Sequence, residues 1–122
     1  MTKMGSETAT FTKQDRDLIR LEFMDRFGSA VSIHEGFWLR RWATGPRKGE
    51  PKIPPVVQSM IERDLVRVVE DGERLPRVHL TDAGLRALVE MADDLRAFQP
   101  PERYSHLLAE IAELRSSSED AG

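Results

Sequence analysis

Residues 66–84, VRVVEDGERLPRVHLTDAG, constrain the fold of this chain more than any other segment. They contain two short runs rich in β-branched residues, VRVV and RVHL, around Asp71-Gly72, a dipeptide typical of hairpin turns. The sequence therefore predicts a two-stranded hairpin with a five-residue tip, residues 71–75. Thr81 directly follows the second run and can cap a helix that begins there.

Apolar residues at helical spacing predict five helices in the rest of the chain. The first should run from about residue 12 to 27, with Thr12 and Asp15 as a capping box. The other four are expected from Glu35 through EGFWLRRWA, over about 54–65, over 81–98 and over 102–115. The intervening TGPRKGEPKI contains two glycines and two prolines and predicts an exposed loop.

The remaining segments are expected to be short or irregular. Residues 30–33, AVSI, predict a brief edge strand, whereas residues 1–11 predict a flexible N-terminus and 116–122 a disordered polar tail. Residues 12–98 are expected to form one domain. The C-terminal helix within 99–115 either folds back on the helix before it or forms a dimer contact with a second copy, and both alternatives are open.

Composition excludes several classes of function. The chain has 122 residues and no cysteine, and its three histidines lack the spacing of a zinc site. No phosphate-binding glycine loop or nucleophile elbow is present, so we expect neither an enzyme nor a cofactor or metal. No stretch approaches the roughly 18 apolar residues of a membrane span. A cytoplasmic protein without a membrane contact is the expectation.

The net charge of −3 hides an uneven distribution of charges along the chain. Residues 1–29 are neutral, residues 30–80 carry nine basic and seven acidic side chains, and residues 81–122 carry four basic and nine acidic ones. Residues 37–52 contain five basic side chains against Glu50 alone. This local excess of +4 predicts a basic patch on an otherwise acidic protein.

The predicted order of elements resembles a winged helix-turn-helix over residues 12 to about 92. The stretch VVQSMIERDLVRVVEDGERLPRVHLTDAG is similar to the recognition helix, the wing and the wing-to-helix junction of bacterial MarR-like and PadR-like regulators. Leu80, Thr81 and Gly84 match the Leu-Thr-x-x-Gly motif that leaves the wing in those families. The resemblance implies an α+β, mainly helical fold and a sequence-specific transcriptional regulator that binds double-stranded DNA. It also implies a homodimer formed through the C-terminal helices.

Ten side chains form the predicted DNA-binding set. The resemblance places three of them on the major-groove side of the helix over 54–65, where Gln can pair with adenine and Arg with guanine: Gln58, Ser59 and Arg63. Two more lie on or near the wing: Arg74 and Arg77. Five basic residues would contact phosphates independently of base sequence: Arg40, Arg41, Arg47, Lys48 and Lys52.

A second interpretation of the same residues is a winged-helix protein–protein interaction module without DNA binding. Its support is the acidic total, the apolar IPPVV at the start of the helix over 54–65, and the outward-facing Glu62. The two interpretations differ in the salt dependence of DNA binding, which only a phosphate contact produces. Trp38 and Trp42, one helical turn apart, are expected to pack in the core rather than to contact a ligand.

Overall fold

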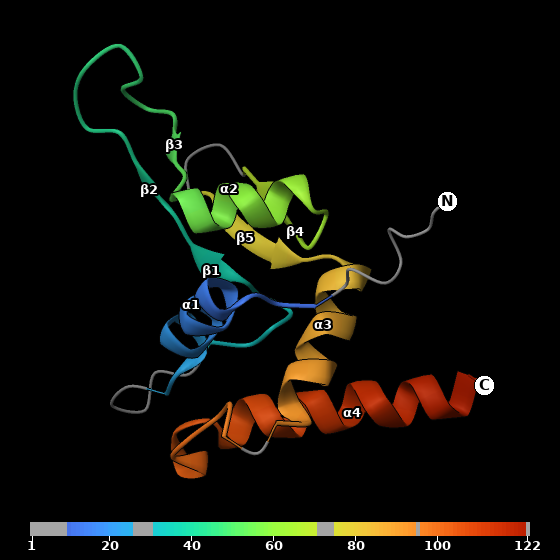
Figure 1. Ribbon diagram of the computed structural model, residues 1–122. Helices are drawn as coiled ribbons and strands as arrows, with labels where there is room; N and C mark the ends of the chain where they lie inside the picture. Colours follow the sequence, from blue (N-terminus) through green and yellow to red (C-terminus); the bar gives the residue numbers. More distant parts are fainter. Residues whose placement is uncertain (1–9, 26–30, 71–74, 95, 122) are drawn as a thin grey trace.

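The computed structural model describes residues 10–25, 31–70, 75–94 and 96–121, and this part of the chain is an α+β structure, mostly helical (Figure 1). Its helices are α1 (Lys13–Phe23), α2 (Pro55–Glu62), α3 (Asp82–Ala92) and α4 (Ser105–Ala121), with a 3-10 turn, η2 (Pro101–Arg103), before α4. Its strands are β1 (Phe37–Trp38), β2 (Arg40–Arg41), β3 (Pro51–Lys52), β4 (Val66–Val69) and β5 (Arg77–Leu80). None of the described helices combines the length and apolar character that a membrane crossing requires.

The first helix begins as the sequence predicts. The Thr12 hydroxyl accepts a hydrogen bond from the Asp15 backbone amide at 3.2 Å, and the Asp15 carboxylate accepts one from the Thr12 amide at 2.9 Å. This reciprocal capping box satisfies two donors that a helix N-terminus otherwise leaves without partners. The helix ends at Phe23 rather than near residue 27, and residues 26–30 lie outside the described part.

The predicted helix from Glu35 is wrong, because this segment forms strands. Phe37 lies opposite Val78 in β1–β5, and the following residues form β2. Burial alternates along the chain here: Phe37 and Leu39 are buried, whereas Trp38 is 47% exposed. Trp38 is therefore not a core residue, contrary to the sequence-based expectation. The edge strand predicted at 30–33 is also absent from residues 31–33, where the chain enters a turn.

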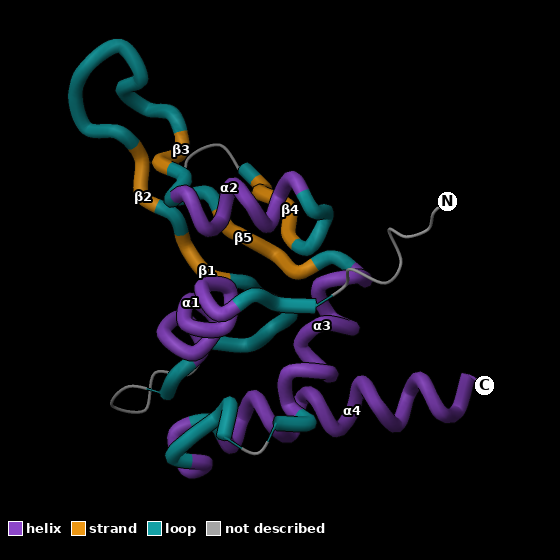
Figure 2. The backbone as a smooth tube through the Cα atoms, in the orientation of Figure 1, coloured by secondary structure: helices purple, strands orange, loops and turns teal. Residues whose placement is uncertain are grey.

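The hairpin over 66–80 is confirmed. Strands β4 and β5 pair in antiparallel register, and β1 joins the other edge of β5, so the order of the three-stranded sheet is β1-β5-β4 (Figure 2). One face carries the buried Val66 and Val78, and the other carries Arg67 and His79, which lie directly opposite each other. Tip residues 71–74 lie outside the described part.

The Leu-Thr-x-x-Gly sequence holds the hairpin against its neighbours. The Thr81 hydroxyl donates to the Asp64 carbonyl at 2.6 Å and accepts from the Gly84 amide at 3.1 Å. The Thr81 amide donates to the Leu65 carbonyl at 3.0 Å. A Cβ on Gly84 would lie 2.0 Å from that same carbonyl oxygen, so only glycine allows this approach. The motif therefore has a structural role, which is to join the end of α2 to the start of α3.

Gly84→Ala should destabilise the fold by about 2 kcal/mol, because the new methyl group must displace the Leu65 backbone rather than a mobile side chain. The sign of the change in the free energy of unfolding distinguishes this clash from the usual effect of the substitution. A glycine replaced by alanine within a helix normally gains about 0.5–1 kcal/mol. Urea denaturation of both proteins measures the difference, and a stabilised Gly84→Ala variant would refute the close approach.

The C-terminal helix folds back within the chain. Helix α3 ends at Ala92 instead of residue 98, and the following turn buries Phe98 against Tyr104, with ring centroids 5.2 Å apart. Leu107 and Ile111 of α4 are buried in the same core and α4 packs on α3. Of the two alternatives for the helix within 99–115, the structure shows the intramolecular one.

Two further features concern the C-terminal segment. The Tyr104 hydroxyl donates to the Arg20 carbonyl at 3.0 Å, which ties the start of α4 to α1. Because Tyr104 is buried, residues 99–115 complete the core of residues 12–98 and are not a separate appendage. The helix also continues to Ala121, where the sequence predicted a disordered tail from residue 116; residue 122 lies outside the described part.

Candidate nucleic-acid interface

A β-hairpin over residues 40–52, which we call the basic arm, projects from the helices (Figure 1). Its strands β2 and β3 pair with Arg40 opposite Lys52. The Trp42 amide donates to the Glu50 carbonyl and the Gly49 amide to the Trp42 carbonyl, both at 2.9 Å, which extends the pairing into the loop. Residues 43–50 are all exposed, so the predicted exposed loop is confirmed and is the outer part of an ordered hairpin.

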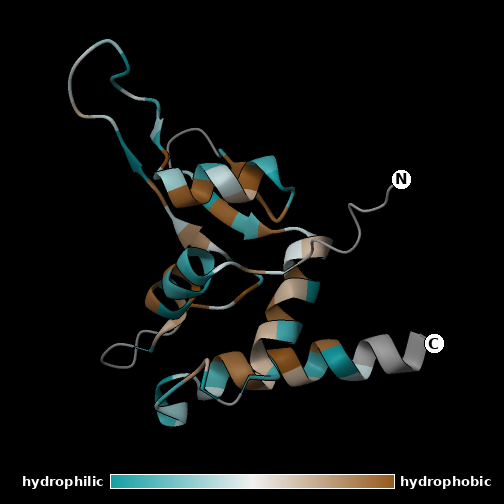
Figure 3. Cartoon of the chain, in the orientation of Figure 1, coloured by the Kyte–Doolittle hydropathy of each residue, from teal (hydrophilic) through white to brown (hydrophobic). Residues whose placement is uncertain are grey.

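The basic arm brings together the five residues that were predicted to contact phosphates. It is hydrophilic along most of its length (Figure 3). Four of its cations are exposed and form no ion pair with any carboxylate in the described residues: Arg40, Arg47, Lys48 and Lys52. The fifth, Arg41, is bound to Glu70 at 3.0 Å and donates to the Gly49 carbonyl at 2.7 Å. Arg41 therefore braces the hairpin rather than offering an open charge.

Helix α2 presents little positive charge. Gln58 is exposed, and its amide lies 3.3 Å from the Glu62 carboxylate. The outward orientation predicted for Arg63 is wrong: its guanidinium lies 2.8 Å from the carboxylate of Asp15, which is fully buried. Arg63 also donates to the Ser59 hydroxyl, so Ser59 serves this internal pair and is only partly exposed. Of the three residues predicted to read bases, Gln58 is exposed, whereas Ser59 and Arg63 are partly buried.

The outer face of the three-stranded sheet adds a second basic surface. The guanidinium of Arg77 lies over the ring of Trp38, 5.1 Å from its centroid. Arg67 and His79 share this face, and Arg74 lies outside the described part. Partial burial and then the nearby guanidinium groups of Arg77 and Arg67 hold the pKa of His79 below its ordinary value. Sequence reasoning missed Arg67, which the register of β4 and β5 places on the same face as Arg77.

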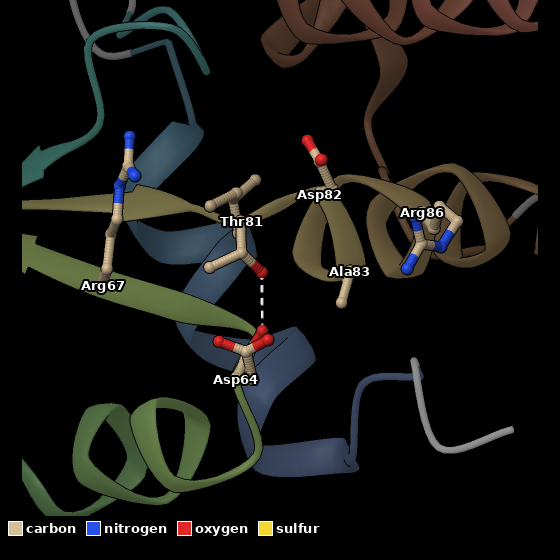
Figure 4. A pocket seen from close by; sticks show the side chains of 7 residues that line it. Asp64, Arg67, Thr81, Asp82, Ala83 and Arg86 are labelled. Carbon is tan, nitrogen blue, oxygen red and sulfur yellow. Dashed lines mark hydrogen bonds between the residues drawn. The ribbon is translucent and has the colours of Figure 1, made fainter. Parts of the chain in front are cut away.

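A pocket of about 360 Å³ lies where the sheet meets α3 (Figure 4). Arg67 and Arg86 line it from opposite ends, and the carboxylates of Asp64 and Asp82 lie between them. The charges of these four side chains cancel, so the pocket has no preference for an anion. We therefore assign it no part in the interface.

In the described part of the chain, no three His, Cys, Asp or Glu side chains are grouped so that they could hold a metal ion. Comparison with known protein families, with curated proteins and with solved structures finds no match to this chain. The functional interpretation therefore depends on the geometry and the charge of the basic arm and the surfaces beside it.

Proposed function

We propose that this protein binds double-stranded DNA and acts as a transcriptional regulator, with the basic arm as its principal contact. The observation that carries the proposal is a set of four exposed cations on one projecting hairpin, none of them paired with a carboxylate of the described residues. The net charge of the chain is −3. When basic side chains contact DNA phosphates, the counterions condensed on the DNA are released into solution. This release favours binding regardless of base sequence. The C-terminal segment over 81–122, with nine acidic and four basic side chains, would be repelled by the phosphates.

The shape of the basic arm suits this task. The major groove of DNA admits a two-stranded β-ribbon as well as a helix. Arg47 and Lys48 lie in the loop of the arm and would contact phosphates, while Gln58, on the exposed side of α2, would supply a base contact. Sequence preference would be modest, because α2 carries no other exposed side chain suited to a paired base contact.

We interpret the fold as a variant of the winged helix of MarR-like and PadR-like bacterial regulators. The order α1, β1, α2, β4, β5, α3 and the sheet order β1-β5-β4 support this interpretation. In the variant, the basic arm stands in the chain where the second helix of a helix-turn-helix would come. We also propose a homodimer, because two-fold symmetry would present two arms to half-sites about one helical turn apart. Since Leu107 and Ile111 are used within the chain, the contact would employ other residues of α4.

A salt titration of binding to random duplex DNA tests the function. Four phosphate contacts predict a slope of about −3.6 for the logarithm of the association constant against the logarithm of the salt concentration. Fluorescence anisotropy of a labelled duplex measures the constant at each ionic strength. Absence of binding at low salt, or a slope near zero, would contradict the proposal and favour the protein-interaction module.

A further inference from the structure

A groove of about 560 Å³ lies between α1, the base of the basic arm and the start of α2. Apolar side chains form much of its wall, among them Leu18 of α1, Trp38, Trp42 and Ile53. Buried core residues, including Val57 of α2, reach its floor. The groove is therefore a place where the apolar interior of the described structure is open to the surface.

The backbone beside this groove is extended. The segment from Glu35, which the sequence predicted to be helical, forms β1 and β2 and continues into the arm. Trp38, 47% exposed, is consequently among the most exposed large apolar side chains that the structure describes. An exposed apolar surface of this kind beside polar residues is typical of interaction sites.

The charges around the groove are arranged asymmetrically. Arg40 and Lys52 face each other across the β2–β3 pair on the arm side, and both are exposed. Glu22 lies on the α1 side. An apolar floor with cations along one edge complements an acidic segment that also carries apolar side chains. A phosphate backbone fits less well, because it has no apolar groups to place against Leu18 and Trp38.

We propose that this groove binds an acidic peptide segment of a partner protein. The apolar side chains of the peptide would insert beside Leu18 and Trp38, and its carboxylates would pair with Arg40 and Lys52. Both cations belong to the basic arm, so a bound peptide would compete with DNA for them. The competition depends on the proposed DNA binding, whereas the peptide site itself does not.

Selection from a phage-displayed library of random peptides about 12 residues long tests the site. We expect the enriched sequences to combine Asp or Glu with Leu, Phe or Trp. The most enriched peptide, synthesised with a fluorescent label, would then be titrated with the unmodified protein and with two variants. Leu18→Gln, in the groove wall, should weaken peptide binding by about tenfold or more. Leu21→Gln is the matched control, because Leu21 is on the same helix, exposed, and outside the groove lining.

Two comparisons separate this proposal from the DNA-binding one. Replacing Arg47 and Lys48 by Ala removes arm charges that do not line the groove, so it should weaken DNA binding and leave the peptide affinity unchanged. Leu18→Gln should weaken peptide binding and leave the affinity for DNA unchanged. If the protein binds no DNA but binds the peptide through Leu18, the proposed function fails and the peptide site stands.

Three results would overturn the peptide site. The library could yield no enriched sequence, or the enriched sequences could lack acidic residues. The selected peptide could also bind Leu18→Gln as tightly as the unmodified protein while circular dichroism shows both to be folded. If Leu18→Gln weakens DNA binding instead, the groove belongs to the DNA interface and the peptide proposal is wrong.

Discussion

Replacing Arg47, Lys48 and Lys52 together by Ala should lower the affinity for duplex DNA on the order of 100-fold at physiological ionic strength. Each phosphate contact adds about 0.9 to the slope of the logarithm of the association constant against the logarithm of the salt concentration. Between 1 M and 0.15 M salt, this slope raises the association constant about fivefold per contact. Losing three contacts therefore lowers the affinity by the product of three such factors, on the order of 100-fold. The slope should flatten by about 2.7. Fluorescence anisotropy across a salt series measures both quantities. The three side chains are exposed, and Lys52 loses the contact of its ammonium with the Trp42 ring, 4.9 Å from the centroid, so circular dichroism should check that the variant stays folded.

The matched control removes three positive charges elsewhere on the surface. All three are exposed and none belongs to the basic arm: Lys13 is in α1, Arg96 follows α3, and Arg103 is in η2. Their replacement by Ala changes the net charge by the same amount but should reduce the affinity far less and leave the slope nearly unchanged. Equal losses in the two triple variants would mean that DNA responds to total charge and that the arm is not the contact.

The local excess of basic residues over 40–52 could be predicted from sequence because these residues are neighbours in the chain, whereas the hairpin was not predicted and Arg40 and Arg41 were expected in a helix. Five cations within residues 40–52 stay together in almost any local conformation, and the glycines and prolines of TGPRKGEPKI indicated exposure. The predictions of the hairpin over 66–80 and of the cap at Thr81 were correct for the same reason, because turn and capping signals act over a few residues. The structure adds the pairing of Arg40 with Lys52, which the loop composition did not indicate.

The segment EGFWLRRWA was assigned wrongly because it satisfies two periodicities. Trp38 and Trp42 have helical spacing, yet Phe37 and Leu39 also alternate with exposed neighbours as in a strand. Pairing with Val78, some forty positions further along the chain, decides between the two conformations. A pairing over such a distance leaves no signal in the local pattern.

The contact of Arg63 is likewise one that a local sequence pattern does not reveal. Helical spacing places it with Gln58 and Ser59 on a face that can point outward, but it cannot tell which neighbouring element approaches that face. The partner is Asp15, on a helix far back in the sequence. The ion pair removes from the candidate interface the one cation that the helix over 54–65 was expected to supply. Replacing Asp15 should therefore change the stability of the fold rather than the affinity for DNA.

Asp15→Ala should destabilise the protein by about 3 kcal/mol, the second large effect that we expect. Removing one partner of a buried ion pair leaves the other without compensation and typically costs 3–5 kcal/mol. Arg63, 28% exposed, can partly turn to water, which reduces this cost. Loss of the capping box at Thr12 adds to it. Urea denaturation monitored by circular dichroism measures the change, with Asp17→Ala, on the exposed side of the same helix, as the control.

The double variant Asp15→Ala, Arg63→Met distinguishes the ion pair from the capping box. Replacing the second partner by an apolar side chain removes the uncompensated charge, so the double variant should be more stable than Asp15→Ala alone. If it is less stable, Arg63 contributes through other contacts, such as its bonds to Ser59. The salt slope of DNA binding should be the same for Arg63→Met and the unmodified protein, because this guanidinium is bound internally. A flatter slope would place Arg63 at the phosphates after all.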